Sequence, residues 1–291
     1  MDRVLITGAN GFLGQHLCLF LKKAGFEIIA TGKGLSRLSD KEIVYESAEL
    51  TDKMEVKKLL AKVQPDIIIH NAALSKPDEC ENNRDFCVDI NVNATRHLLE
   101  ASSGHFIYLS TDFVFGENGP HSEEDEPAPL NFYGETKLKA EHMVAKFHLQ
   151  TTIVRPVFIY GQSWEGMRPT FLHWIKNNLE GNKPIKVVSD QWRTPTYVGD
   201  ICKGIETIIH QQATGAYHLA GKEILSPYEM AMHTAEVLQL DSSLIEKVTA
   251  DTFPEPVKRA KRSGLKIDKA KAELSYNPIS FEEGVRRTFE L

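Results

Sequence analysis

A glycine-rich turn close to the N-terminus constrains the fold of this chain more than any other feature. The turn spans residues 7–14, directly after a short apolar run and before an amphipathic run at Phe12–Ala24. Gly8 can take backbone angles that a Cβ forbids, Gly11 lets a pyrophosphate approach the chain, and Gly14 lets the helix pack on the strand. The free N–H groups and positive dipole end of the helix would face the phosphates. The turn therefore predicts a dinucleotide-binding βαβ unit, with these residues on the cofactor: Gly8, Asn10, Gly11, Phe12, Leu13 and Gly14.

The order of apolar and amphipathic runs extends this unit into a whole domain. Short apolar runs at 4–7, 27–31, 67–70, 106–110 and 152–155 alternate with helical patterns at 12–24, 52–63, 85–102 and 132–146. This alternation predicts an α/β fold of Rossmann type, a doubly wound parallel sheet covered by helices. The regularity weakens after Gly161, although strands are predicted at 185–188 and 217–219, and capping boxes at Ser226 and Ser280 begin two late helices. We expect a cofactor domain over residues 1–161, together with 184–220, and a smaller α/β substrate domain from 162–183 and 221–291.

Composition excludes several classes of protein. The 291 residues are 42% apolar and 25% charged, as in ordinary globular proteins. The net charge of −6 and the lack of a basic stripe argue against nucleic acid or an anionic membrane as a partner. No stretch reaches the ~20 apolar residues of a membrane span, and no signal peptide is recognisable. The four cysteines have neither paired nor zinc-like spacing, and the eleven histidines have no metal-like spacing, so we expect a cytoplasmic protein without a metal.

The end of the second predicted strand bears on the choice of cofactor. NAD enzymes usually place an acid there to bind the ribose 2′-hydroxyl. Here the run Ile29–Gly34 has no acid; it contains Lys33, and Arg37 follows it. They would attract a 2′-phosphate, so the sequence favours NADP(H), with NAD(H) as the alternative. The other explanation of both cations is that they are solvated surface charges.

A tyrosine and a lysine indicate the chemistry. Tyr133 and Lys137 are four residues apart at the start of a predicted helix, so they share one face. A tyrosine pKa of about 10 must fall for proton transfer at neutral pH, and a nearby ammonium supplies such a shift. Thr111 follows the strand at 106–110, at the carboxyl edge where α/β sheets bind ligands. The pair alone is a common helix spacing, but with the glycine turn and Thr111 it predicts an oxidoreductase.

These motifs together resemble a known family. The glycine turn, Asn71-Ala72-Ala73, Ser110-Thr111-Asp112 and Tyr133-x-x-x-Lys137 resemble the extended short-chain dehydrogenase/reductase family. The stretches 110–116, 129–138 and 190–197 are similar to the dTDP-4-dehydrorhamnose reductases of that family, and the likeness covers most of residues 1–200.

The resemblance implies a reaction, NADPH-dependent reduction of the 4-keto group of a nucleotide-linked 6-deoxy sugar. Tyr133 would act as general acid, and Thr111 would help polarise the same oxygen. Glu49 stands where the family usually has an aspartate against adenine, and Asn91 matches an asparagine that supports the lysine through water, with a local helix hydrogen bond as its alternative. The implied cofactor residues beyond the turn are Lys33, Glu49, Ala72, Ala73, Asn91, Ser110, Tyr133, Lys137 and Pro156.

A second set of residues is expected on the nucleotide-sugar substrate. Trp164 could stack on a base or sugar, or could pack in a lid. Arg193 could bind a phosphate, or could be a surface arginine. The full set of expected substrate residues is Ser75, Thr111, Asp112, Phe113, Trp164 and Arg193. A homodimer is left open.

Rival functions differ from this one at particular residues. A dehydratase of the family commonly has a Thr-Asp-Glu run, in which the glutamate two residues after the catalytic threonine acts as acid or base. This chain has Phe113 at that position. A 4-epimerase usually keeps NAD and an acid on strand two, where this chain has Lys33. The non-catalytic regulatory subunit of methionine adenosyltransferase resembles the same reductases, and the stretch 123–131 is similar to it as well. The acidic run 123–126 is expected to be a solvated loop.

Overall fold

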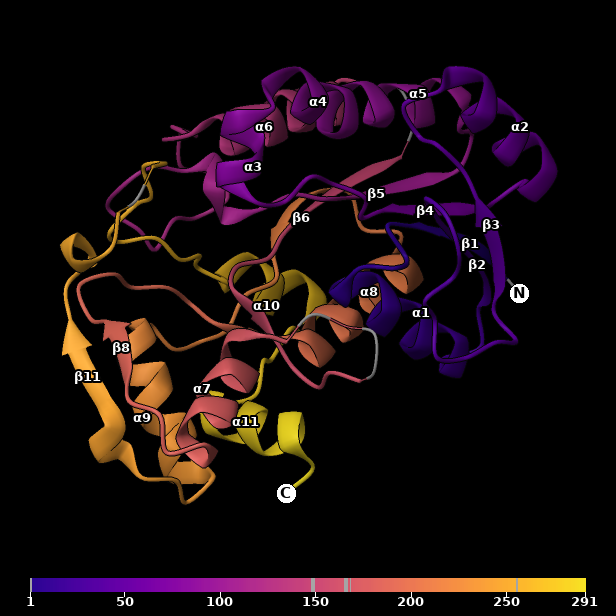
Figure 1. The fold of residues 1–291 in the computed structure, drawn as a ribbon. Helices are drawn as coiled ribbons and strands as arrows, with labels where there is room; N and C mark the ends of the chain where they lie inside the picture. The colour runs from indigo at the N-terminus through magenta and orange to yellow at the C-terminus, as the bar shows by residue number, and fades with distance from the viewer. Residues whose placement is uncertain (1, 148–149, 165–166, 168, 255) are drawn as a thin grey trace.

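A seven-stranded sheet forms the centre of the larger part of the molecule (Figure 1). The structure is a computed structural model that describes residues 2–147, 150–164, 167, 169–254 and 256–291. The strand order is β3-β2-β1-β4-β5-β6-β10, and every neighbouring pair is parallel. Because the order reverses between β1 and β4, the switch point lies at their carboxyl ends. The strands are β1 (Arg3–Thr7), β2 (Glu27–Gly32), β3 (Val44–Ser47), β4 (Ile67–His70), β5 (His105–Leu109), β6 (Thr151–Arg155) and β10 (Gly215–His218).

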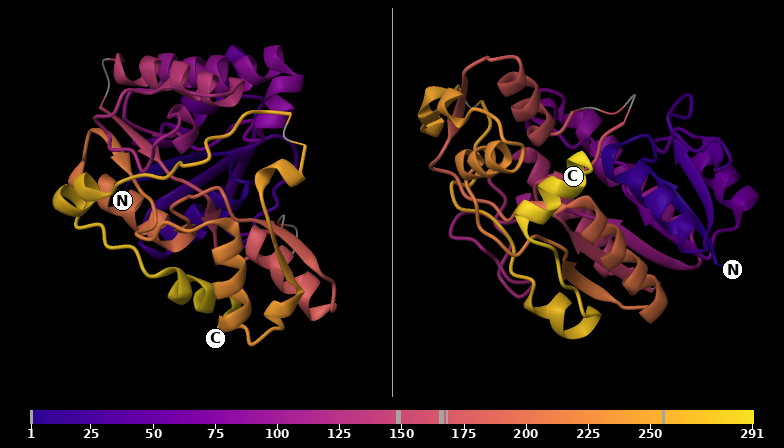
Figure 2. Two further views of the ribbon diagram at one scale, coloured as in Figure 1. Left: turned by 90° about the vertical axis from the view of Figure 1, so that its left-hand side faces the viewer. Right: turned by 90° about the horizontal axis from the view of Figure 1, so that it is seen from below.

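Helices cover both faces of this sheet, as the alternating pattern predicted. Helices α1 (Phe12–Lys23), α8 (Val198–Gln211) and α10 (Asp268–Leu274) lie below it in Figure 1, and α1 and α8 lie side by side in the right-hand view of Figure 2. Helices α2 (Lys53–Val63), α5 (Ala94–Ala101) and α6 (Phe132–Ala145) lie above it. Side chains of one strand alternate between the two cores: Val4 and Ile6 pack with the first group, and Leu5 packs with the second. The Rossmann-like, doubly wound fold is confirmed.

The helix predicted over 85–102 is interrupted in the structure. Its parts are α4 (Arg84–Val88), the π-helical turn η1 (Asp89–Asn93) and α5, and the short helix α3 (Pro77–Asn82) precedes them. A π-helical turn inserts an extra residue into a helix and is frequent at functional sites. Here it carries Asn91, whose side chain is buried. A further short turn, η2 (Asp112–Val114), follows β5.

The remaining elements pack around a separate apolar cluster at the lower left of Figure 1. Two small parallel sheets pair β7 (Ile159–Tyr160) with β9 (Thr196–Tyr197), and β8 (Ile185–Val188) with β11 (Ile245–Val248). The predicted caps are present, since the Ser226 side chain accepts from the Glu229 N–H and the Ser280 side chain accepts from the Glu283 N–H. The helices and short turns here are α7 (Phe171–Glu180), α9 (Pro227–Val237), α11 (Phe281–Phe289), η3 (Ser242–Leu244) and η4 (Ala250–Thr252).

The segment 184–220, which we predicted to belong wholly with the cofactor domain, divides between the two parts. Helix α8 and strand β10 join the large sheet, whereas β8 pairs with β11 and packs against α9. The alternating burial of β8, with Ile185 and Val187 inside, fits a small sheet covered on one side rather than a central strand buried on both. Among the described residues, no helix is long and apolar enough to cross a membrane.

Candidate active site

A cleft of about 850 Å³ lies at the carboxyl ends of the central strands. Its walls come from the glycine turn, the ends of β2, β4 and β5, the start of α6, and the segment that leads into α7. This is the switch point of the sheet, where ligands of open α/β folds bind. The predicted site residues that line it are Gly8, Asn10, Gly11, Phe12, Leu13, Lys33, Glu49, Ala72, Ala73, Ser75, Ser110, Tyr133, Lys137 and Pro156.

The glycine turn has the geometry that a bound pyrophosphate requires. Gly8 has a φ of +64°, and a Cβ there would lie 2.8 Å from the Ala72 backbone. A Cβ on Gly14 would lie 2.3 Å from the Gly8 carbonyl oxygen, so this glycine packs helix against strand rather than lining the cleft. No side chain caps α1 at Gly11, which leaves the first N–H groups of the helix to a ligand. The residues present therefore fit the phosphates of a dinucleotide.

A buried histidine holds this turn against the end of β4. Thr7 Oγ1 lies 2.8 Å from His70 Nδ1, and Thr95 Oγ1 lies 3.0 Å from His70 Nε2. The Thr95 hydroxyl donates to the Asn91 carbonyl and so accepts from Nε2, which assigns the ring proton to Nε2. Thr7 Oγ1 then donates to Nδ1 and accepts from the N–H groups of Asn71 and Ala72. Burial lowers the pKa of His70 to about 3, in keeping with a neutral supporting ring.

Charged groups of both signs stand at the end of β2. Lys33 Nζ lies 2.7 Å from Glu49 Oε2, and this pairing raises the pKa of the lysine and lowers that of the glutamate. Arg37 also lines the cleft, and its backbone N–H donates to Asn10 Oδ1. Asn10 Nδ2 donates to the Leu35 carbonyl, so one side chain fixes the loop that carries both cations. Two cations and one carboxylate thus surround the place where the adenosine of a dinucleotide would lie.

Tyr133 and Lys137 line the base of the cleft, and the buried Thr111 lies beside them in hydrogen-bonding contact with Tyr133. Lys137 Nζ donates to the Leu109 carbonyl at 2.6 Å and lies 4.1 Å from the centre of the Tyr108 ring. Burial lowers the pKa of Lys137 to about 7. Burial raises the pKa of Tyr133 above its ordinary value, and a hydrogen bond with Thr111 opposes that rise. The three residues that the sequence singled out are therefore brought together by α6 and the end of β5.

Asp112, Phe113 and Arg193 lie behind this group rather than in the cleft. The Asp112 carboxylate accepts from Thr111 Oγ1 at 3.2 Å and from Ser263 Oγ at 3.1 Å, and burial raises its pKa. The Phe113 ring packs edge-to-face on Tyr133 at 5.5 Å. The Arg193 guanidinium donates to the Ala260 carbonyl, Ser263 Oγ and Gln191 Oε1. In the described structure Arg193 is thus a buried support for the loop beside Asp112, and it does not line the cleft as a phosphate ligand would.

Asn91 and Trp164 also make contacts within the protein. Asn91 bonds the backbone N–H and carbonyl of Leu74 at 2.8 and 3.1 Å, and donates to Thr136 Oγ1 at 3.1 Å. It therefore joins the loop after β4 to α6, a longer-range link than a local helix bond. Trp164 Nε1 donates to Gln15 Oε1 at 3.1 Å, beside the start of α1. Neither residue is among the described residues that line the cleft.

Comparison with known proteins assigns this architecture to a family. Residues 1–291 match the RmlD substrate-binding domain. The chain belongs to that family. Spore coat polysaccharide biosynthesis protein SpsK of Bacillus subtilis is 30% identical over 98% of this chain and 96% of its own length. The methionine adenosyltransferase 2 subunit beta of Pongo abelii is 34% identical over 85% of this chain and 75% of its own length.

A solved structure supports the same assignment. The dTDP-4-dehydrorhamnose reductase of Bacillus anthracis, crystallised with NADP, superposes with a TM-score of 0.88 at 30% identity, and covers 99% of both chains. Membership of the RmlD family confirms the predicted relation to the extended short-chain dehydrogenases/reductases.

Sequence reasoning missed one wall of the cleft in this RmlD-family chain. Phe158 lines it with a φ of +41°, in the left-handed region that is rare for an aromatic residue, and packs edge-to-face on Phe171 at 5.6 Å. Phe86 also lines the cleft and is 52% exposed. These residues lie far apart in the sequence and have no common motif. Of the two, only Phe86, an aromatic residue in the short helix α4, could have been singled out from the sequence.

Proposed function

We propose that this chain is an NADPH-dependent reductase of the 4-keto group of a nucleotide-linked 6-deoxy sugar. One observation carries the proposal: a tyrosine and a buried lysine line the base of a cleft that also fits a dinucleotide, and a threonine hydroxyl is hydrogen-bonded to that tyrosine. SpsK, by its name a protein of polysaccharide biosynthesis, and the dTDP-4-dehydrorhamnose reductase of B. anthracis support a sugar as the substrate.

The residues of the chain divide the work as follows. NADPH, when bound, supplies the hydride. The Tyr133 hydroxyl donates its proton to the substrate oxygen as that oxygen gains negative charge. The Thr111 hydroxyl, which donates to Asp112 in this structure, would turn its one proton to the same substrate oxygen as that oxygen gains negative charge. Lys137, as an ammonium ion held by the Leu109 carbonyl, favours the tyrosinate that remains.

The surroundings of Thr111 support reduction over dehydration. Loss of water from a sugar needs a carboxylate that can reach the substrate carbon. Asp112 is 5% exposed and hydrogen-bonded to Ser263, and the neighbouring Phe113 presents an aromatic ring to Tyr133. The cleft thus offers no acid beside the threonine from this segment.

NADP(H) is proposed as the cofactor, with NAD(H) as the alternative. Lys33 and Arg37 lie on the cleft at the end of β2, where a 2′-phosphate would be accepted as their counter-charge. Glu49 neutralises part of that charge through Lys33, so Arg37 is the cation left to bind the phosphate most directly. An epimerase with NAD bound is the weaker proposal because this site is positive.

A second candidate comes from the methionine adenosyltransferase subunits. Their 34% identity over 85% of this chain makes a non-catalytic, NADP-binding subunit a real rival. Thr111, Tyr133 and Lys137 would then be present without turnover. The two candidates differ in whether keto-sugar reduction occurs.

The test is to mix the purified protein with NADPH, and separately with NADH, and a panel of nucleotide-linked 4-keto-6-deoxy sugars, and to follow the absorbance of the cofactor. We expect oxidation of NADPH with at least one sugar, and loss of turnover with retained NADPH affinity in Tyr133→Phe. No oxidation with any sugar, together with a stable complex with a methionine adenosyltransferase catalytic subunit, would establish the rival instead.

A further inference from the structure

The catalytic helix carries a third buried polar residue that the proposed mechanism does not use. Glu141 follows Tyr133 and Lys137 at the same interval of four residues on α6, so all three share one face. Its side chain is 3% exposed. Burial of a carboxylate costs folding free energy unless a cation pairs with it, so Glu141 requires a partner.

Arg155, at the end of β6, is that partner. Arg155 Nε lies 2.9 Å from Glu141 Oε1, and Nη2 lies 2.6 Å from Oε2, a bidentate pair between helix and sheet. The remaining nitrogen, Nη1, donates to His218 Nε2 at 3.3 Å. His218 is therefore protonated on Nδ1 and donates to the Lys266 carbonyl at 3.1 Å.

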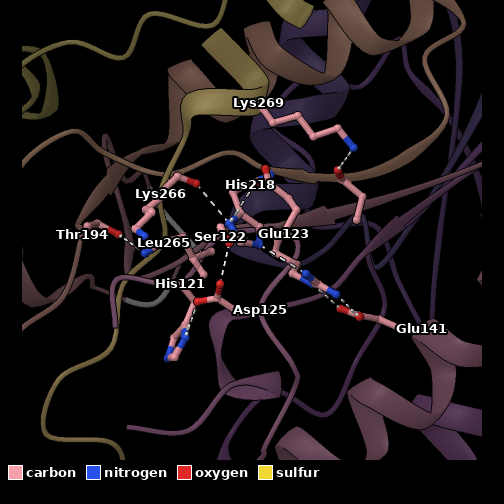
Figure 3. Close-up of polar contacts among 12 residues, drawn as sticks. His121, Ser122, Glu123, Asp125, Glu141, Thr194, His218, Leu265, Lys266 and Lys269 are labelled. Atoms are coloured by element: carbon pink, nitrogen blue, oxygen red, sulfur yellow. Dashed lines mark hydrogen bonds and ion pairs between the residues drawn. The ribbon is translucent and has the colours of Figure 1, made fainter. Parts of the chain in front are cut away.

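The same chain of contacts reaches the loop before α6. The His218 backbone N–H donates to Glu123 Oε1 at 2.8 Å, as Figure 3 shows. The Glu123 side chain is 7% exposed, so the prediction that 123–126 is a solvated loop is wrong at its first residue. That loop ends at Asn131, whose side chain caps α6 by accepting from the Gly134 N–H. The network centred on Arg155 thus contacts α6 at Glu141 and, through His218, the loop that leads into the helix.

Glu141 also bears on the charge of Lys137. Of the groups that favour the charged form of Lys137 against burial, the Glu141 carboxylate acts most strongly, ahead of the two thiols. The charged and titratable groups that face Lys137 come from five elements and are Cys80 of α3, Cys87 of α4, His70 of β4, Tyr108 of β5, and Tyr133 and Glu141 of α6.

We propose that Glu141, clamped by Arg155, is a positioning residue that holds Lys137 at the cleft as an ammonium ion. The role of Glu141 in catalysis rests on the proposed function, whereas its effect on the charge of Lys137 does not depend on any substrate. A carboxylate one helical turn away, with the two Cβ atoms about 6 Å apart, changes the pKa of a buried amine by about one to two units. Without Glu141, Lys137 would lose its proton at a lower pH, and the tyrosinate would lose its counter-charge.

The direct experiment is an NMR titration of Lys137 in protein with ¹³C-labelled lysine, its signal assigned from Lys137→Met. We expect the midpoint in Glu141→Gln to fall by about one pH unit relative to wild type. Because the single variant leaves Arg155 buried and unpaired, Glu141→Gln/Arg155→Met is measured as well, since replacing both partners of a buried pair commonly preserves the fold. Its midpoint should fall by less, in the same direction, because Arg155 lies beyond the carboxylate.

Glu123→Gln is the matched control, because it removes another buried carboxylate of the same network that is not among the groups acting most strongly on Lys137. Its Lys137 midpoint should stay at the wild-type value. An unchanged midpoint in the folded Glu141 variants, or an equal shift in Glu123→Gln, overturns the proposal. Turnover on a keto sugar should show the same shift in the pH at which kcat declines. If no sugar is reduced, the proposed function fails while the titration still decides the role of Glu141.

Discussion

Gly14→Ala tests the physical basis of the cofactor cleft most directly. The added Cβ would lie 2.3 Å from the Gly8 carbonyl oxygen and 2.8 Å from Ala9 Cα. Both are backbone atoms, so no side-chain rotation relieves the contact. Ordinary separation requires the Gly8 peptide or the start of α1 to move by about 1 Å, since carbon contacts are favourable near about 3.5 Å.

The size of the effect follows from two opposing terms. Overpacking of this kind costs about 1–3 kcal/mol, and the rigid backbone places this case at the upper end. Alanine regains about 1 kcal/mol over glycine within a helix. The net loss is about 2 kcal/mol of unfolding free energy, which lowers Tm by about 3 °C for a chain of this size. Because Gly8 shapes the phosphate turn, NADPH affinity should fall at least about tenfold, equivalent to about 1.4 kcal/mol.

Thermal unfolding and NADPH fluorescence titration measure the two effects. Gly11→Ala is the matched control, because its Cβ would be 3.2 Å from the same oxygen. It should lose only about 0.5–1 kcal/mol, the usual cost of alanine at a helix N-cap, yet still bind NADPH poorly. A Tm for Gly14→Ala equal to or above wild type would refute the close approach of α1 to the glycine turn.

Three further predictions concern the residues of the cleft. Thr111→Val should lower kcat about 10²-fold or more while NADPH affinity stays within about twofold, and an equal loss of affinity would contradict its place at the substrate oxygen. Lys33→Ala and Arg37→Ala should each lower the preference for NADPH over NADH, Arg37→Ala by about tenfold or more in the ratio of kcat/KM, because Glu49 already pairs with Lys33. Lys137→Met should abolish a pH dependence of the free energy of unfolding. Burial lowers the pKa of Lys137 in the folded state to about 7, whereas in the unfolded state it is about 10.4. Between these two pH values the unfolded state binds more protons, so wild type gains stability as pH rises. Urea unfolding from pH 7 to 10 should show this rise in wild type alone, and parallel curves for both proteins would contradict it.

Much of the fold follows from patterns that are local in the sequence. The β1–turn–α1 unit could be predicted because strand burial, glycine freedom and helix periodicity are read over a few residues each. The face shared by Tyr133 and Lys137 depends only on the helical repeat. The break of the predicted 85–102 helix by a π turn was not predictable, because Asn91 is placed by bonds to Leu74 and Thr136 rather than by helix propensity.

Other predictions required distant segments to meet. Arginine commonly binds phosphate, yet the Arg193 guanidinium donates to the Ala260 carbonyl and to Ser263, which lie more than sixty positions later in the sequence. The segment 184–220 divides because β8 finds β11 as its partner, and β11 lies in the last part of the chain. An apolar pattern predicts a strand but not the strand it pairs with, because pairing depends on which apolar faces of the strands become buried in the assembled fold.

The sequence by itself determined that this chain forms a dinucleotide-binding sheet with a tyrosine and a lysine on one helix face, because each of these features depends on residues close together in the chain. Only the tertiary structure decided which polar residues are buried and paired. Glu141 and Glu123 look like ordinary surface carboxylates in the sequence, and their burial depends on contacts with Arg155 of β6 and His218 of β10. A buried charge is tolerated only where the fold places a partner of opposite charge or a hydrogen-bonding group beside it, and that placement depends on the tertiary structure.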